Sequence, residues 1–365
     1  MKIGIVLHPY GEEKPGGLPR VIFEWTKALI ERDKKNQYIV YLKNKPKKNP
    51  DLPGNNWKLE TLGGGIFWQD KLKDKEKADI YIFNTPVLPL FFRPPKSIII
   101  AYDFPYKYLP SKNWKEYIQY KVTGFYHLLS LKRADAIISV SKSTKDEVVK
   151  FFGISPEKIT PIYHGFKRIC TEPETVVSVP DKFFFFAGTI KERKNVWNIV
   201  KAFNLFKKEN PNTKHKVVIG GKKAGEYYEK IVNYAKENNL EQDVIFLDHI
   251  NDSQLSYVYK KAEALIFPSL IEGTGNPILE AMDCGIPVIT SNIFGPAELG
   301  DDGSAVLIDP YNPEDIKKAM VKITKDSDFR NKLIKKGFEQ VKKFSWDIAY
   351  KETLSLLNRI YKKNA

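Results

Sequence analysis

The chain has 365 residues, of which 42% are hydrophobic and 13% aromatic, and its formal net charge is +15. This length is too great for one ordinary core and indicates two domains of roughly 150 to 180 residues each. No stretch approaches the ~20 uninterrupted apolar residues that a membrane span needs. The two cysteines, Cys170 and Cys284, offer at most one bridge and lack metal-ligand spacing, which favours a reducing, cytoplasmic setting.

Short apolar runs of strand length recur along the chain, separated by stretches with helical periodicity. The runs are residues 3–7, 38–42, 80–83, 98–101 and 136–140 in the first half, and 183–187, 217–219, 244–247, 264–267 and 288–290 in the second. Most are continuously apolar, as expected of parallel strands covered on both faces. One predicted helix has Asn195 as its N-cap and buries one face, formed by Val196, Ile199, Val200, Phe203 and Phe206. The alternation predicts two doubly wound, Rossmann-like α/β domains.

The predicted boundary lies in residues 168–180, which contain two prolines and show no clear period. We therefore expect an N-terminal domain over 1–167, a linker over 168–180 and a C-terminal domain over 181–345. A last helix over 346–365 is expected to pack back toward the N-terminal domain.

Most of the positive charge belongs to residues 1–167, which contain 29 Lys and Arg against 17 Asp and Glu. Nucleic-acid binding is disfavoured, because the chain has no zinc-finger spacing and no RNP-like run. Aromatic and basic residues interleave in one predicted helix, namely Trp114, Tyr117, Tyr120, Phe125 and Tyr126 with Lys112, Lys115, Lys121, Lys132 and Arg133. This composition is typical of a segment on an anionic membrane surface. A solvated basic surface over ordinary core aromatics is the alternative.

In open parallel sheets, ligands bind beyond the carboxyl ends of the strands. Three loops of the second half follow such ends, at residues 188–195, 220–223 and 268–277. In the third loop, Asn276 is the expected N-cap and Pro277 suits the first helical turn. Gly273 and Gly275 let backbone amides approach a ligand closely. A helix start of this kind binds phosphate without a metal, so these loops predict an anion site.

Charged side chains flank this helix start. Arg193 and Lys194 of the neighbouring loop supply positive charge, while Glu272 and Glu280 lie before the turn and in the first helical turn. Two carboxylates beside a phosphate are costly unless they accept hydrogen bonds, and sugar and ribose hydroxyls are the obvious donors. The alternative is that Glu280 only complements the helix dipole and the glycines only serve a turn.

The run from Glu272 to Thr290 resembles the E-G-F-G-x-P-x-x-E-A-M-A-x-G-x-P-V signature of glycosyltransferase family 4 (GT4), whose members are retaining enzymes with the GT-B fold. Gly188-Thr189-Ile190 with Arg193-Lys194-Asn195 is similar to the variant seen in mannosyl- and rhamnosyltransferase-like members. Looser matches are Gly16-Gly17, the serine-rich turn at 139–143 and Phe344-Ser345-Trp346. The resemblance covers nearly the whole chain and implies two Rossmann-like domains facing an interdomain cleft.

The resemblance also implies roles for the matching residues. Lys194 and Arg193 would neutralise the leaving diphosphate, Glu272 would bind sugar hydroxyls and Glu280 the ribose. The base would lie near Gly220, Gly221 and the His249-Ile250 turn, and the N-terminal domain would bind the acceptor. The implied catalytic residues are Lys194, Arg193, Glu272 and Asp103. The implied donor-binding residues are Gly16, Gly17, Gly188, Thr189, Gly220, Gly221, His249, Ile250, Gly273, Thr274, Gly275, Asn276 and Glu280.

Three positions depart from the family pattern. Thr274 replaces an aromatic residue beside the donor, Thr189 replaces an arginine, and Tyr102 replaces the histidine that precedes the aspartate in many members. Asp103 itself follows a predicted strand, where orienting an acceptor and capping a turn are equally good interpretations.

The implied reaction is retaining transfer of a hexose of mannose, rhamnose or glucose type. The donor would be a GDP-, UDP- or dTDP-sugar, and the acceptor a glycan or lipid-linked hydroxyl in cell-surface polysaccharide or glycolipid synthesis. No cofactor or metal is expected, since the only Asp-x-Asp, Asp326-Ser327-Asp328, is interpreted as a helix cap. The expected location is the cytoplasm, with the inner face of the membrane as a hypothesis. The alternatives are a non-catalytic glycan- or membrane-binding GT-B protein, a nucleotide-sugar epimerase or a phosphorylase.

Overall fold

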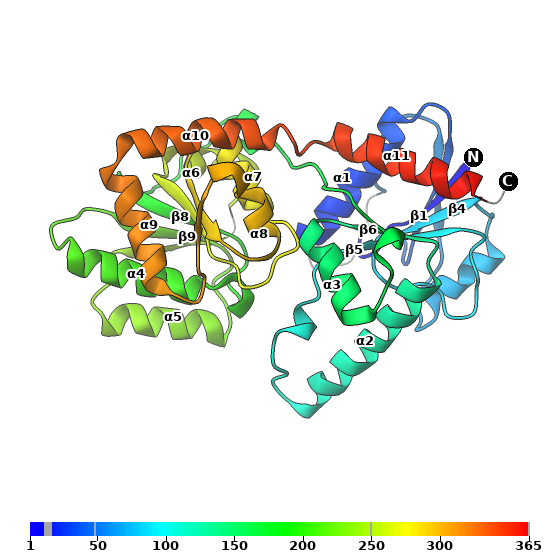
Figure 1. Ribbon diagram of the computed structural model, residues 1–365, viewed down its shortest axis with the longest axis horizontal. Helices are drawn as coiled ribbons and strands as arrows, with labels where there is room; N and C mark the ends of the chain where they lie inside the picture. Colours follow the sequence, from blue (N-terminus) through cyan, green and yellow to red (C-terminus); the bar gives the residue numbers. More distant parts are fainter. Residues whose placement is uncertain (11–16, 47–48, 249, 364–365) are drawn as a thin grey trace. The chain divides into compact units, whose positions relative to one another are not determined.

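The computed structural model (Figure 1) describes residues 1–10, 17–46, 49–248 and 250–363. The chain forms two compact units, unit 1 with Met1–Gly165 and Phe344–Ala365, and unit 2 with Phe166–Lys343. Residues 168–180, which were predicted to be a linker, are part of unit 2. In the described ranges, every helix is too short or too polar to cross a membrane.

The described part of unit 1 contains a seven-stranded parallel sheet with the strand order β3-β2-β1-β4-β5-β6-β7. The strands are β1 (Lys2–Val6), β2 (Gln37–Leu42), β3 (Trp57–Thr61), β4 (Ile80–Phe83), β5 (Ser97–Ala101), β6 (Ala136–Ser139) and β7 (Ile159–Pro161). The helices are α1 (Gly17–Arg32), α2 (Trp114–Arg133), α3 (Lys142–Phe152) and α11 (Trp346–Lys362). The inner strands consist mostly of buried apolar residues, many of them β-branched or aromatic, as expected of parallel strands covered on both faces.

The last helix completes the core of unit 1. Figure 1 shows α11 beside α1, and its side chains Ala349, Leu356, Leu357 and Ile360 join the cluster formed by α1 and the sheet. The indole Nε1 of Trp25 donates a buried hydrogen bond of 3.1 Å to Oγ1 of Thr353. The helix begins where Ser345 accepts the amide of Ile348, so Ser345 is its N-cap.

The described part of unit 2 contains a six-stranded parallel sheet with the order β10-β9-β8-β11-β12-β13. The strands are β8 (Phe183–Ala187), β9 (Lys216–Gly220), β10 (Val244–Leu247), β11 (Ala264–Phe267), β12 (Val288–Ser291) and β13 (Val306–Ile308). The helices are α4 (Val196–Glu209), α5 (Glu226–Glu237), α6 (Asp252–Lys261), α7 (Asn276–Asp283), α8 (Phe294–Leu299), α9 (Pro313–Lys325) and α10 (Ser327–Val341). Figure 1 shows α4, α5 and α9 over one face of this sheet and α6, α7 and α10 over the other.

All the predicted strands form, with ends shifted by one residue at most. The prediction missed β3, β7 and β13. These are edge strands, and they are short or half-exposed, so their sequences lack a continuous apolar run. In unit 2, the strand order reverses between β8 and β11. A reversal of this kind leaves a crevice at the carboxyl ends of the two strands, where ligands bind in such folds.

Candidate active site

Two loops of unit 2 meet at this reversal. The loop after β8 contains a short 3-10 helix, η5 (Glu192–Lys194), and the loop after β11 leads into α7. The amide of Leu270 donates to the carbonyl of Arg193 at 2.8 Å, which joins the two loops. The side-chain amide of Asn195 donates to the carbonyls of Pro268 at 3.1 Å and Pro310 at 2.7 Å. Asn195 is the N-cap residue of α4, as predicted, but its backbone is left-handed (φ 58°) and its side chain makes this crosslink and no capping hydrogen bond.

The residues Arg193, Lys194 and Glu272 form one ionic cluster. Both the Lys194 ammonium and the Arg193 guanidinium donate to Oε2 of Glu272, the latter at 3.1 Å. The Lys194 side chain is almost wholly buried, and its Nζ lies 4.6 Å from the centre of the Phe267 ring. Burial alone would raise the pKa of Glu272, but the charges of Lys194 and Arg193 outweigh it and hold this pKa below its usual value. The carboxylate therefore stays ionised beside two fixed cations.

The start of α7 differs from the prediction. Gly275 is the N-cap, with φ at 124°, a value that side chains rarely tolerate, and Asn276 is already the first helical residue. Pro277 lies in the first turn, as predicted. The Oδ1 atom of Asn276 is buried without a hydrogen-bond partner among the described residues. The first amides of α7 thus follow a glycine with positive φ and lie beside the buried Oδ1 of Asn276, which suits an anionic or hydroxyl-bearing ligand.

Glycines at this edge allow backbones to touch. A Cβ on Gly221 would lie 2.1 Å from the carbonyl oxygen of Gly188, and the Gly188 amide donates to the carbonyl of Gly220 at 2.9 Å. A Cβ on Gly295 would lie 2.2 Å from the carbonyl oxygen of Gly273. These glycines let the loops after β8 and β9 touch, and let the loop after β11 touch the start of α8.

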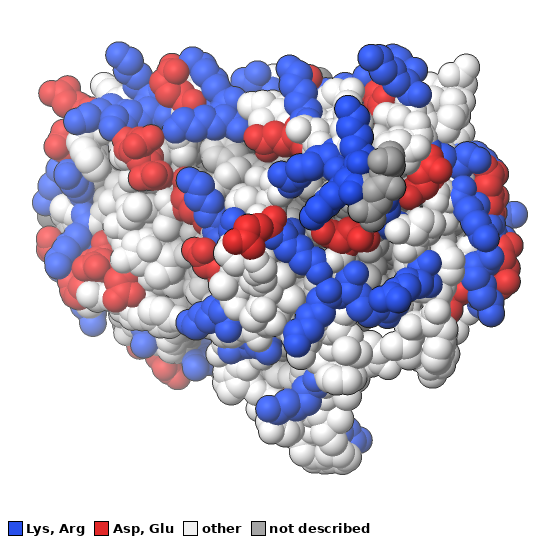
Figure 2. Space-filling model, turned by 45° about the vertical axis from the view of Figure 1, so that its right-hand side comes forward, with Lys and Arg blue, Asp and Glu red and all other residues white. Residues whose placement is uncertain are grey.

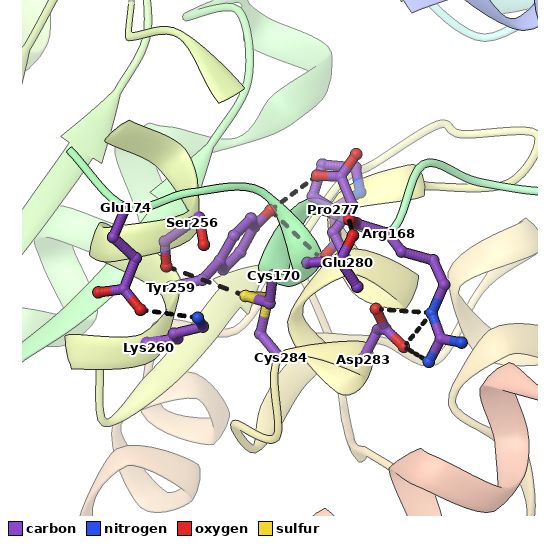
Figure 3. The surroundings of a disulfide bond; sticks show 11 residues. Arg168, Cys170, Glu174, Ser256, Tyr259, Lys260, Pro277, Glu280, Asp283 and Cys284 are labelled. Atoms are coloured by element: carbon purple, nitrogen blue, oxygen red, sulfur yellow. Dashed lines mark hydrogen bonds and ion pairs between the residues drawn. A yellow bond between two sulfur atoms is a disulfide. The ribbon is translucent and has the colours of Figure 1, made fainter. Parts of the chain in front are cut away.

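Glu280 lies on the fifth residue of α7, past the first turn in which it was predicted. It is only 8% exposed, and the hydroxyl of Tyr259 on α6 donates to its Oε2 at 3.0 Å (Figure 3). A buried, directional hydrogen bond of this kind fixes the carboxylate more firmly than a helix dipole does. The sequence analysis missed Tyr259, since an aromatic residue on the buried face of a helix gives no signal that distinguishes a hydrogen-bonding role from packing.

The remaining predicted site residues are donor-binding residues and Asp103, which was predicted to be catalytic. Thr189 is exposed, while Thr274 and Ile250 are half-buried, all at the carboxyl edge of the unit 2 sheet. Gly17, which begins α1, and Asp103, which follows β5, belong to unit 1. Gly16 and His249 lie outside the described residues. Beside Asp103, the hydroxyl of Tyr102 is buried and has no hydrogen-bond partner among the described residues.

Asp326 caps α10 by accepting the amide of Phe329 at 2.8 Å, in agreement with its interpretation as a helix cap. Over the described ranges, no group of three or more His, Cys, Asp and Glu side chains is placed to hold a metal ion. The two cysteines form a disulfide, Cys170–Cys284, with their Cα atoms 5.3 Å apart. The bridge that the sequence allowed is therefore present, although it was not expected in a reducing compartment.

Residues 172–340 match the sequence profile described as glycosyl transferases group 1, and residues 15–167 match the profile of Glycosyltransferase Family 4. The chain belongs to glycosyltransferase family 4. It is 26% identical over 285 residues to O-antigen chain mannosyltransferase B of Escherichia coli, and the match covers 75% of this chain and 73% of that protein. It is 30% identical over 252 residues to the serotype-specific mannosyltransferase WbdA of E. coli, covering 66% of this chain but 30% of WbdA.

The same fold occurs in Anabaena HepE, solved with UDP and glucose, with a TM-score of 0.76 and 16% identity over 98% of this chain and 100% of HepE. The predicted α/β GT-B fold, the family and the assignment as a glycosyltransferase are thus confirmed. For this family 4 glycosyltransferase, the roles of individual residues stay predictions.

Proposed function

We propose that this family 4 glycosyltransferase transfers a hexose with retention of anomeric configuration from a nucleotide-diphosphate sugar to a hydroxyl of a glycan or lipid-linked acceptor. The observation that carries the proposal is the cluster of Lys194, Arg193 and Glu272 beside the start of α7. The cations and the helix amides supply the positive field that a diphosphate needs, and the ionised carboxylate accepts sugar hydroxyls.

In the proposed mechanism, the departing diphosphate interacts with the positive charges of Lys194 and Arg193, both of which are paired with Glu272 in this structure. As the sugar–phosphate bond breaks, Lys194 and Arg193 stabilise the negative charge that grows on the phosphate oxygens. The same phosphate accepts the proton of the attacking hydroxyl on the same face of the sugar, so a separate basic side chain is unnecessary. Two cations and the amides of α7 make a divalent metal unnecessary as well. Asp103 of unit 1 orients the acceptor.

The sugar proposed first is mannose, because O-antigen chain mannosyltransferase B and WbdA are mannosyltransferases by name. Rhamnose and glucose are the other two donor sugars to be tested. The product would be a cell-surface polysaccharide or a glycolipid, made on the cytoplasmic side of the membrane.

The test is a panel of GDP-, UDP- and dTDP-sugars, each examined for protection against thermal unfolding and for transfer in the presence of EDTA. A ligand that binds only the folded state raises the melting temperature, by about 2.7 kcal/mol of stabilisation at a hundredfold excess over Kd. We expect one nucleotide class to protect and to support transfer without metal. If no member of the panel protects the protein, or if transfer stops with EDTA, the proposal is wrong in the corresponding part.

We also propose that unit 1 contacts an anionic membrane through α2. With about 100° between successive helical residues, Trp114, Tyr117, Ile118, Val122 and Phe125 fall on one side of α2, and each is between 48% and 68% exposed. The other side faces the protein. There the ring of Tyr106 contacts that of Tyr120, and the Tyr106 hydroxyl is hydrogen-bonded to Nδ1 of His127. An apolar face turned to solvent is the reverse of an ordinary surface helix. In Figure 2 the lowest part of the surface, formed by the start of α2, is mostly uncharged with a few basic side chains.

A second exposed apolar tip lies at the other end of α2. Phe67 and Phe91 are in ring contact at 5.4 Å, and Phe91 is 74% exposed. The loop that carries Phe91 is attached to α2, because Arg133 donates to the carbonyl of Pro89 at 2.9 Å. Aromatic side chains at both ends, with lysines between them, match the interface of an anionic bilayer.

The membrane proposal predicts that the protein cosediments with phosphatidylglycerol-containing vesicles and less with phosphatidylcholine alone. Phe125→Ser should weaken this binding several-fold, whereas Tyr311→Ser, which removes an exposed ring from unit 2, should not. The proposal would be refuted if both variants lost vesicle binding equally, or if the protein bound both kinds of vesicle equally well.

A further inference from the structure

Tyr259 is the side chain that connects α6 to the carboxylate of Glu280. It is fully buried, and its ring stands edge-on to Phe185 of β8, with the ring centres 5.3 Å apart. Packing therefore fixes the hydroxyl, which donates to Glu280 Oε2 at 3.0 Å. Burial and the charge of Glu280 raise the pKa of Tyr259 well above its ordinary value, so the hydroxyl keeps its proton and remains a donor at all physiological pH values.

A segment near the start of unit 2 holds α6 and α7 together, and we call residues 168–175 the strap. On the α7 side, the disulfide joins Cys170 to Cys284, the C-cap of the helix, and Arg168 donates to Asp283 Oδ1 from Nε at 3.0 Å and from Nη2 at 2.5 Å. The carboxylate of Asp283 is almost fully buried beneath this contact.

On the α6 side, the strap makes three further contacts, and Figure 3 shows those of Glu174 and Cys170. The ammonium of Lys260 donates to Glu174 at 2.7 Å, the amide of Thr175 donates to the carbonyl of Ser253 at 3.2 Å, and Cys170 Sγ lies 3.9 Å from the carbonyl oxygen of Ser256. A disulfide and an ion pair on the α7 side, with an ion pair and a backbone hydrogen bond on the α6 side, thus tie the strap to both helices.

We propose that Tyr259 is a positioning residue for Glu280 in recognition of the nucleotide ribose, and that the Cys170–Cys284 disulfide makes this recognition sensitive to redox state. The inference rests on the proposed function, in which Glu280 accepts the ribose hydroxyls. A helix of eight residues is about 12 Å long, so a constraint at the C-cap of α7 acts on the whole helix, including the turn that carries Glu280. Reduction to two thiols, by a dithiol that is itself oxidised to a disulfide, removes the covalent constraint and leaves the Arg168–Asp283 pair in place.

Calorimetric titration with UDP and with GDP, each beside its 2′-deoxy and 3′-deoxy analogues, tests the role of Tyr259. We expect the wild-type protein to bind one ribonucleotide about tenfold more tightly than its deoxy analogues, since each lost bond to a carboxylate costs about that factor. Tyr259→Phe, which keeps the ring, should abolish most of this preference and leave the affinity for inorganic diphosphate unchanged. Tyr257→Phe, on the same helix, is the matched control and should behave as wild type.

Unchanged ribose preference in Tyr259→Phe would overturn the role of Tyr259. If the wild-type protein binds none of UDP, GDP and dTDP, the proposed function itself fails, which is a different result. Lost affinity for inorganic diphosphate together with the nucleotide would mean general distortion of the site and would also overturn the positioning role.

The redox part is tested by repeating the titration with dithiothreitol. Reduction should lower the ribose preference about threefold, because the noncovalent contacts of the strap persist. The double variant Cys170→Ser, Cys284→Ser should show the lower preference from the start and should not respond to dithiothreitol. If reduction lowers the melting temperature but leaves the ribose preference unchanged, the disulfide is purely structural and this part of the inference is wrong.

Discussion

Lys194→Ala would remove the buried cation that is paired with Glu272. If Lys194 stabilises the leaving diphosphate, its loss removes one of two side-chain cations from the growing negative charge. Loss of a single preorganised donor of this kind costs about 3 to 4 kcal/mol of transition-state stabilisation, or a factor of 10² to 10³ in kcat. Lys191→Ala is the matched control, because Lys191 lies on the same loop but is exposed. Steady-state transfer assays should show the loss in the first variant only.

The same substitution has a consequence for stability that can be measured without a substrate. The pKa of Glu272 is lowered in the folded protein, so the stabilisation is present above its unfolded value of about 4.3 and is lost as the pH falls through the folded value. Without Lys194, only the charge of Arg193 opposes the effect of burial, so the pKa of Glu272 rises. Urea unfolding should therefore show a deficit of Lys194→Ala that is about 1 to 2 kcal/mol larger at pH 7 than at pH 4. A deficit independent of pH, or an active variant, would refute the reasoning.

Three further predictions concern other parts of the chain. Asp70 accepts the amides of Leu90, Phe91 and Phe92 at 3.2, 2.6 and 2.6 Å, so Asp70→Ala should cost about 2 to 4 kcal/mol in chemical unfolding, and a loss under ~1 kcal/mol would contradict this. Gly221→Ala should lower the melting temperature by several degrees, because its Cβ would overlap the carbonyl of Gly188, and an unchanged melting temperature would disprove that contact. Burial chiefly, with the charge of Asp103, raises the pKa of Glu147 to about 7. Because this folded value is raised, stability falls as the pH rises from about 4.5 to 7, by about 2 to 3 kcal/mol, and Glu147→Gln should remove that slope in unfolding curves measured across this range.

The two sheets and the loops of unit 2 were predictable from the sequence for a definite reason. Central parallel strands are buried on both faces, so their continuous apolar runs indicate both the element and its type. The rule that ligands lie beyond the carboxyl ends then selected Lys194 and Glu272, and the structure joins the two side chains. The edge strand β3 escaped prediction, because polar residues are tolerated where one side of the strand is open to water.

The local roles of the asparagines could not be predicted. Asn195 is the N-cap of α4 and Asn276 is the first residue of α7, yet neither side chain makes a capping hydrogen bond. The side chain of Asn195 is used by two carbonyls from distant parts of the chain, and Gly275 takes the cap of α7 because its φ suits only glycine. Such choices depend on tertiary contacts rather than on neighbouring residues. The same is true of Tyr259, and of Cys170 and Cys284, which are 114 residues apart in sequence.

The division of the chain has a consequence for the order in which the units can be completed during synthesis. Unit 2 is an insertion in unit 1, and its two connections adjoin, since Tyr163 and Phe344 are in ring contact at 5.3 Å. The core of unit 1 needs Leu356, Leu357 and Ile360, which are synthesised after the whole of unit 2. Unit 2 can therefore fold while residues 1–165 still expose the apolar side of α1 that α11 later covers. Folding of unit 1 thus waits for α11, and a nascent chain that stalls after residue 343 has a complete unit 2 and an incomplete unit 1.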